Sequence, residues 1–184
     1  MNRNTCSFFG HRNTILDNNK YQLLIKIIKD LIINKGVTVF LFGSHSRFND
    51  ICYKIVSKLK EKHPQIKRIA YTCKNESCVL ESDIQNHPNI FSFIESQNID
   101  LFIVDEEFDY KTKYTSGKAS YIERNQAMID NSYYCIFYYN KEYKPKEIKH
   151  SKHCVNYYQP KSGTQVAYTY AIRRKKQIIN IVDL

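Results

Sequence analysis

The feature that most constrains the fold is an alternation of apolar runs with amphipathic segments over the first 71 residues. Short apolar runs, typical of buried strands, occupy Thr5–Phe9, Val37–Phe42 and Ile66–Tyr71. Between these runs, Asp17–Asn34 and Arg47–Lys62 carry apolar residues at helical spacing, with Asp17 or Asn18 as the first N-cap. Uninterrupted apolar strands that alternate with helices predict a mainly parallel sheet with helices on both faces.

The second half of the chain repeats this pattern less regularly. A helix is predicted over Lys118–Asp130, a buried strand over Tyr133–Tyr139 and a helix over Thr164–Arg174, followed by a final strand in "QIINIV" (177–182). A short helix near Pro88–Gln97 and a strand within "IDLFIVDEEF" (99–108) are expected in the middle. Because no linker interrupts the series, we expect one α/β domain over residues 1–184.

Composition places the chain among ordinary globular proteins. Hydrophobic residues make up 42% and charged residues 25%, and no apolar run approaches the roughly 20 residues that span a bilayer. "MNRNTCSFFG" lacks the apolar stretch of a signal peptide, so a soluble, cytoplasmic protein is expected, with no membrane partner. The six cysteines lack the spacing of a secreted disulfide framework and are expected to be reduced thiols.

No metal site or cofactor is predicted from the cysteine and histidine positions. Cys73 and Cys78 are separated by four residues, and His150, His153 and Cys154 follow much later. This spacing is irregular for a structural zinc site.

The net charge of +10 suits either a nucleic acid or a small anionic ligand. Basic clusters occur in "KHPQIKR" (62–68) and "IRRKKQ" (172–177), but much of the positive charge is lysine spread along helix faces. A nucleic acid is therefore the less favoured partner.

Three small-residue turns follow predicted strands or open a predicted helix. They contain Gly10, Gly43-Ser44 and Ser162-Gly163-Thr164. Glycine permits close backbone approach, and free N–H groups at a helix N-terminus favour an anion such as phosphate. Each turn alone is more typical of an ordinary strand-to-helix connection than of a ligand site, whereas three turns at one sheet edge favour a ligand site.

His11 and Arg12 directly follow the first glycine. They provide an imidazole and a guanidinium fork for phosphate. The alternative is structural: Arg12 pairs with a local carboxylate and His11 caps a helix.

Four blocks of the sequence resemble the SLOG superfamily, in particular its YpsA-like branch of short bacterial and phage proteins. They are "CSFFGHR", "FGSHSRFNDICYKIVSKLKEKHPQIKRIAY", "GKASYIERNQAMIDNSYYCIFYY" and "SGTQVAYTYAIRRKKQIINI", in the expected order. The resemblance implies a Rossmann-like fold, a homodimer and a pocket for a nucleotide-derived ligand. With the turn residues above, it predicts ligand contacts at Gly10, His11, Arg12, Gly43, Ser44, Arg124, Asn125, Ser162, Gly163 and Thr164.

The same resemblance argues against one enzymatic activity. Related cytokinin-activating phosphoribohydrolases carry two glutamates in Gly-Thr-x-Glu-Glu, where this chain has Val166 and Ala167. Neither side chain can act as acid or base in glycosidic cleavage. A sensor or sequestering module is therefore favoured over the alternative of a hydrolase or transferase that acts on a nucleotide.

For that catalytic alternative, Glu123 and Arg124 are the candidate residues. Asp105, Glu106 and His11 are the other available acid–base groups.

Overall fold

The computed structural model describes residues 3–43, 46–74, 76–87, 89, 102–111, 113, 117–145 and 161–184. Its main sheet has six strands in the spatial order β6-β3-β2-β1-β7-β8. The strands are β1 (Thr5–Gly10), β2 (Val39–Phe42), β3 (Lys67–Thr72), β6 (Glu106–Asp109), β7 (Tyr134–Tyr138) and β8 (Gln177–Asn180). Every neighbouring pair is parallel. The predicted α/β class with a Rossmann-like sheet is confirmed.

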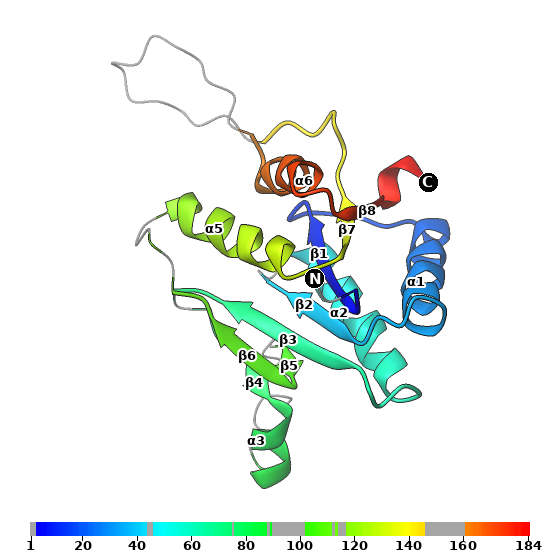
Figure 1. The fold of residues 1–184 in the computed structure, drawn as a ribbon, viewed down its shortest axis with the longest axis vertical. Helices are drawn as coiled ribbons and strands as arrows, with labels where there is room; N and C mark the ends of the chain where they lie inside the picture. The colour runs from blue at the N-terminus through cyan, green and yellow to red at the C-terminus, as the bar shows by residue number, and fades with distance from the viewer. Residues whose placement is uncertain are drawn as a thin grey trace.

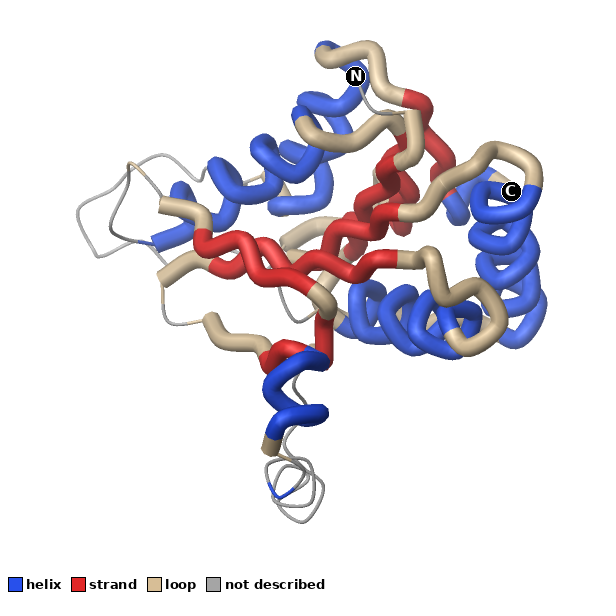
Figure 2. Tube along the Cα trace, turned by 60° about the horizontal axis from the view of Figure 1, so that its bottom comes forward, coloured by secondary structure: helices blue, strands red, loops and turns tan. Residues whose placement is uncertain are grey.

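Four helices cover the two faces of this sheet (Figures 1 and 2). They are α1 (Asn18–Ile33), α2 (Arg47–Lys60), α5 (Gly117–Asp130) and α6 (Gly163–Arg173). The alternation of side chains along a strand sends Phe8 into a core with α1 and α2, and Phe9 into a core with α5 and α6. Both faces are therefore buried, as the continuous apolar strands predict.

Local sequence signals set the helix ends. Asp17 is the N-cap of α1 and accepts a hydrogen bond of 2.8 Å from the backbone N–H of Lys20. Ser46 caps α2 and Ser162 caps α6 in the same way. Gly36, with φ of +66°, adopts the left-handed conformation expected just beyond the end of α1.

The strand order reverses between β1 and β7, which positions the site. From β1 the chain adds β2, β3 and β6 outward on one side, and then adds β7 and β8 on the other. In open parallel sheets, ligands bind at such a reversal, outside the carboxyl ends of the strands.

The middle of the chain forms a small appendage. β4 (Val79–Leu80) pairs in parallel with β5 (Ile103–Val104), and α3 (Glu81–Asn86) projects away from the main sheet (Figure 1). The strand expected within 99–108 is confirmed by β5 and β6, whereas the predicted helix 88–97 falls outside the described residues apart from Asn89.

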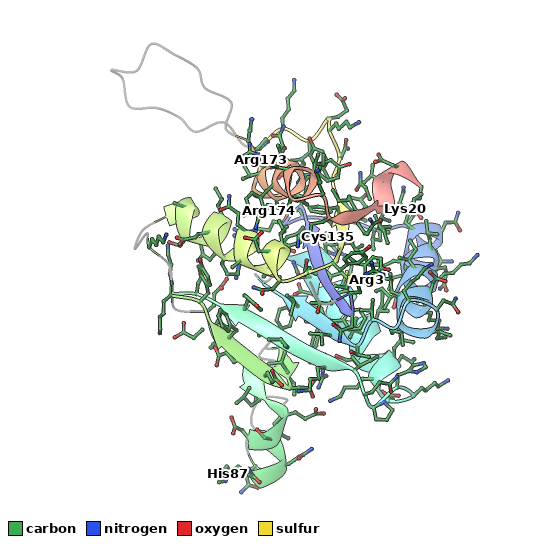
Figure 3. The ribbon with its side chains drawn as sticks, in the orientation of Figure 1. Arg3, Lys20, His87, Cys135, Arg173 and Arg174 are labelled. Carbon is green, nitrogen blue, oxygen red and sulfur yellow. The ribbon has the colours of Figure 1, made fainter. Side chains whose placement is uncertain are left out.

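The final strand is shorter than predicted. It ends at Asn180, and Ile181–Asp183 form a 3-10 turn. The Asn180 side chain donates hydrogen bonds to the Tyr139 carbonyl and to the Asp183 carboxylate, which holds the turn in place. Lys20 of α1, labelled in Figure 3, donates a hydrogen bond to the Ile181 carbonyl. Among the described helices, none is long and apolar enough to cross a bilayer.

Candidate functional site

A cavity of about 650 Å³ lies at the carboxyl ends of β1, β2, β3 and β7. Nine of the ten predicted ligand-binding residues line it: Gly10, His11, Arg12, Gly43, Arg124, Asn125, Ser162, Gly163 and Thr164. The tenth, Ser44, lies outside the described residues. Segments far apart in the sequence thus meet at the reversal of strand order.

The three glycines of these turns differ in what surrounds them. A Cβ on Gly10 would lie 2.4 Å from the Phe48 Cβ, so Gly10 allows α2 to pack against the end of β1. A Cβ on Gly43 would lie 2.9 Å from the Met128 Sδ and 3.2 Å from the Arg124 Cζ. At Gly163, no atom of the described residues lies within 4 Å of such a Cβ, which leaves open space among them at the start of α6.

The start of α6 presents backbone N–H groups to the cavity. Ser162 caps the helix by accepting a hydrogen bond of 3.0 Å from the Gln165 N–H. The N–H groups of Gly163 and Thr164 lie in the first turn, where a helix offers no acceptor of its own. Together with the helix dipole, they form an environment that favours an anion.

His11 is buried against the segment that follows β7. Its Nε2 accepts a hydrogen bond of 3.3 Å from the Asn140 N–H, and its ring stacks on Tyr143 with centroids 3.9 Å apart. Burial lowers the pKa of His11, so the neutral ring is favoured near pH 7. The alternative that His11 caps a helix is wrong, because the ring packs on the loop after β7.

Arg12 is exposed at the cavity edge. Its carbonyl accepts a hydrogen bond from the Arg47 N–H, which ties the turn after β1 to α2. Among the described residues, no salt bridge joins Arg12 to a carboxylate. The side chain therefore remains available to an anion at this edge.

Among the described residues, Arg124 is the largest side chain that is fully buried. Its Nε donates to the Asn125 Oδ1 at 3.1 Å, and its Nη1 donates to the Tyr71 carbonyl at 3.1 Å and to the Glu76 Oε2 at 2.6 Å. Its Nη2 is buried with no hydrogen-bond partner among the described residues. A buried donor that lacks a partner is costly, so this atom is suited to a ligand.

Glu76 is a site residue that the sequence did not reveal. It lines the cavity, forms the ion pair with Arg124 and accepts a hydrogen bond of 3.1 Å from the Cys73 N–H. Glu76 lies in a polar turn after β3, 48 residues from Arg124. The sequence did offer one signal for Glu76, which is its position three residues after Cys73, the residue that directly follows β3. A polar turn of this kind is too common to single out a site residue.

The other acidic candidates lie elsewhere. Glu123 accepts hydrogen bonds from the Lys113 N–H and the Tyr110 hydroxyl and does not line the cavity. Asp105 pairs with Lys60 and Arg68, and Glu106 pairs with Lys67. Of the predicted acid–base groups, only His11 and the Arg124 guanidinium line the cavity.

The Gly-Thr turn is not followed by acidic groups in the cavity. Ala167 packs in the core with α5, and neither it nor Val166 lines the cavity. Within the described part of the chain, no group of three or more His, Cys, Asp or Glu residues is placed to hold a metal. His150, His153 and Cys154 lie outside the described residues.

A scan against protein-family models and a search of curated proteins found no match to this chain. The SLOG resemblance therefore stays a prediction from the motifs quoted above.

Proposed function

We propose that this protein binds a nucleotide or nucleotide-derived small molecule in the cavity at the strand reversal and acts as a sensor or sequestering module. One observation carries the proposal: nine predicted ligand-binding residues from four separate segments line one cavity. The volume of about 650 Å³ falls within the range typical of small-molecule sites. The SLOG resemblance supports the same ligand class.

The phosphate is proposed to lie on the Ser162-Gly163-Thr164 turn. There, the first-turn N–H groups of α6 and the space beside Gly163 leave room for an anion, and the exposed Arg12 lines the same cavity. Arg12 supplies the charged donor.

Binding is favoured over hydrolysis because the one carboxylate among the described residues that line the cavity, that of Glu76, is ion-paired with Arg124. Its acidic side chain, Glu76, is held by Arg124 and by the Cys73 N–H, and Glu123 faces Lys113 and Tyr110. A general base requires hydrogen-bond access to the proton that it removes. The hydrolase or transferase alternative is therefore the second candidate.

The proposal is tested by mass spectrometry of small molecules released from the freshly purified, denatured protein, followed by calorimetry with a nucleotide panel. An intact nucleotide-like compound that rebinds is expected. A released product that is a cleaved form of an added nucleotide would favour the enzyme. If nothing is released and no panel member binds, the proposal is contradicted.

A further inference from the structure

The cavity has two chemically different ends. α6 packs on β1 and β7, whereas α5 packs on β3. The phosphate-binding turn of α6 and His11 thus lie at the β1–β7 end, and Arg124 with Glu76 at the β3 end. These four neighbouring strands span three inter-strand spacings, or roughly 14 Å. An elongated ligand with its phosphate on α6 therefore extends toward Arg124.

Arg124 offers only one nitrogen to such a ligand. A guanidinium has five N–H donors, and the Nε and Nη1 groups of Arg124 are directed to Asn125, Tyr71 and Glu76. The Nη2 group is left, buried and without a partner among the described residues. Arg124 therefore cannot present a free two-nitrogen fork, which is the usual arrangement for phosphate recognition.

Glu76 offsets the charge of Arg124. The two side chains form an ion pair of 2.6 Å, with Arg124 fully buried and the Glu76 side chain 15% exposed. The turn that carries Glu76 includes Lys74 with φ of +60°, a left-handed conformation that is costly for a residue with a side chain. Lys74 itself is exposed and does not line the cavity. The β3 end thus presents a hydrogen-bond donor with little net charge.

Asn49 adds an acceptor to the same cavity. It is 4% exposed, its Nδ2 donates to the Ser46 Oγ at 3.1 Å, and its Oδ1 is buried with no partner among the described residues. A fully ionised phosphate has no proton to donate to this oxygen. The uncharged part of a nucleotide carries both kinds of group: N–H and hydroxyl donors for the Asn49 Oδ1, and ring nitrogens, carbonyls or hydroxyls that accept from the Arg124 Nη2.

We infer that the Arg124–Glu76 pair and Asn49 bind the uncharged polar part of the ligand, so that the ligand carries its negative charge at one end only. This inference rests on the proposed function and narrows it to nucleotides whose base is uncharged. A base with its own negative charge is disfavoured, because it approaches the Glu76 carboxylate.

The test is calorimetry of the wild-type protein with two matched pairs of 5′-monophosphates. Uridine is compared with orotidine, which adds a carboxylate to the base, and inosine is compared with xanthosine, whose base is anionic at neutral pH. The uncharged member of at least one pair is expected to bind about tenfold more tightly or better, since like charges in a desolvated site repel.

Variants separate charge from shape. Glu76→Gln removes the compensating charge and should shift the preference toward the anionic base by about tenfold. Glu76→Asp keeps the charge and should retain the wild-type preference. Glu106→Gln makes the same change in net charge at a surface pair with Lys67 and should behave as wild type. If Glu76→Gln does not fold, the wild-type pairs decide the question.

The outcomes are distinct. If the charged base binds the wild type as well as its neutral partner in both pairs, or if Glu76→Gln discriminates as Glu106→Gln does, the inference is overturned and nucleotide binding stands. If no nucleotide of any kind binds the wild type, the proposed function fails, and this inference fails with it.

Discussion

At the residue scale, two cavity glycines have different reasons to lack a side chain. The Cβ that Gly10 lacks would collide with Phe48, a fully buried residue fixed in the core. The Cβ that Gly43 lacks would press on the side chains of Met128 and Arg124. The first glycine therefore serves the packing of α2, and the second leaves room for Arg124 in the cavity.

Alanine substitution is expected to separate these roles. Gly10→Ala should lower the free energy of unfolding by about 2–3 kcal/mol, since overpacking forces the backbone to move. Gly43→Ala should cost less stability but weaken ligand binding by about tenfold, because the Arg124 guanidinium is displaced. Urea unfolding and calorimetry on both variants measure this. Equal effects of the two changes on both quantities would contradict the assignment.

At the element scale, a cluster of charges joins the appendage to the sheet. Lys60 of α2 pairs with Asp105 and with Glu81 of α3, and Arg68 of β3 pairs with the same two carboxylates. Burial raises the pKa of Asp105, but hydrogen bonds with Glu81, Lys60 and the Arg68 backbone outweigh it and hold the pKa below its usual range. The charged form of Asp105 therefore stabilises the fold.

Asp105→Asn is expected to lower the free energy of unfolding at pH 7 by about 2–3 kcal/mol, because it leaves the buried Arg68 and the partly exposed Lys60 with one partner fewer. A carboxyl group with a lowered folded-state pKa contributes its full stability above its unfolded pKa of about 4 and loses it progressively as the pH falls from that value through the lower folded-state pKa. The difference between wild type and variant should therefore shrink below about pH 4.

Urea titrations between pH 3 and pH 7 measure this difference. Glu106→Gln, at an exposed pair with Lys67, should change stability by less than about 0.5 kcal/mol. A difference for Asp105→Asn that stays constant with pH would show that packing, not charge, holds the cluster.

The elements that the sequence predicted share one property: a continuous apolar strand or an amphipathic face that must be buried. β1, α1, β2, α2 and β3 all have it. α3 was not predicted because it has no buried residue, so its sequence carries no apolar pattern. Ion pairs of Glu81 with Lys60 and Arg68 connect it to the rest of the fold. The Gly10, Gly43 and Gly163 turns were predictable because a parallel sheet brings the carboxyl ends of its strands together.

Glu76 and Asn49 were not predictable in the same way. The partner of Glu76 lies 48 residues away on another helix, and only the fold brings the two together. Asn49 sits at an ordinary position in the first turn of α2, and its unpartnered oxygen becomes visible only when its neighbours are placed. Pairings of this kind leave no periodic pattern in the sequence.

At the scale of the whole molecule, the two basic clusters of the sequence, 62–68 and 172–177, lie where β3 and β8 begin. The cavity lies at the opposite edge of the sheet, where the strands end. Arg174 pairs with Asp130 near the end of α6, where Figure 3 labels it. Lys176 donates to the Asp130 and Ser132 carbonyls, and burial lowers its pKa. Much of this charge is engaged internally, which disfavours a nucleic-acid surface there. The homodimer stays a prediction.

The central claim, that an anion binds on the α6 turn, is tested most directly by a charge placed there. Gly163→Asp meets open space, and an acidic residue in the first turn stabilises a helix by up to about 1 kcal/mol. The variant should therefore fold at least as stably as wild type. The same carboxylate should repel a phosphate from the turn. Gln165→Glu is the matched control, since it adds the same charge in the same turn away from the cavity lining.

The measurement is calorimetry of wild type, Gly163→Asp and Gln165→Glu with the best-binding member of the nucleotide panel. Gly163→Asp is expected to lose at least about a hundredfold in affinity, whereas Gln165→Glu is expected to retain most of it. If Gly163→Asp binds the nucleotide as tightly as wild type does, the phosphate does not lie on the α6 turn, and the account is contradicted.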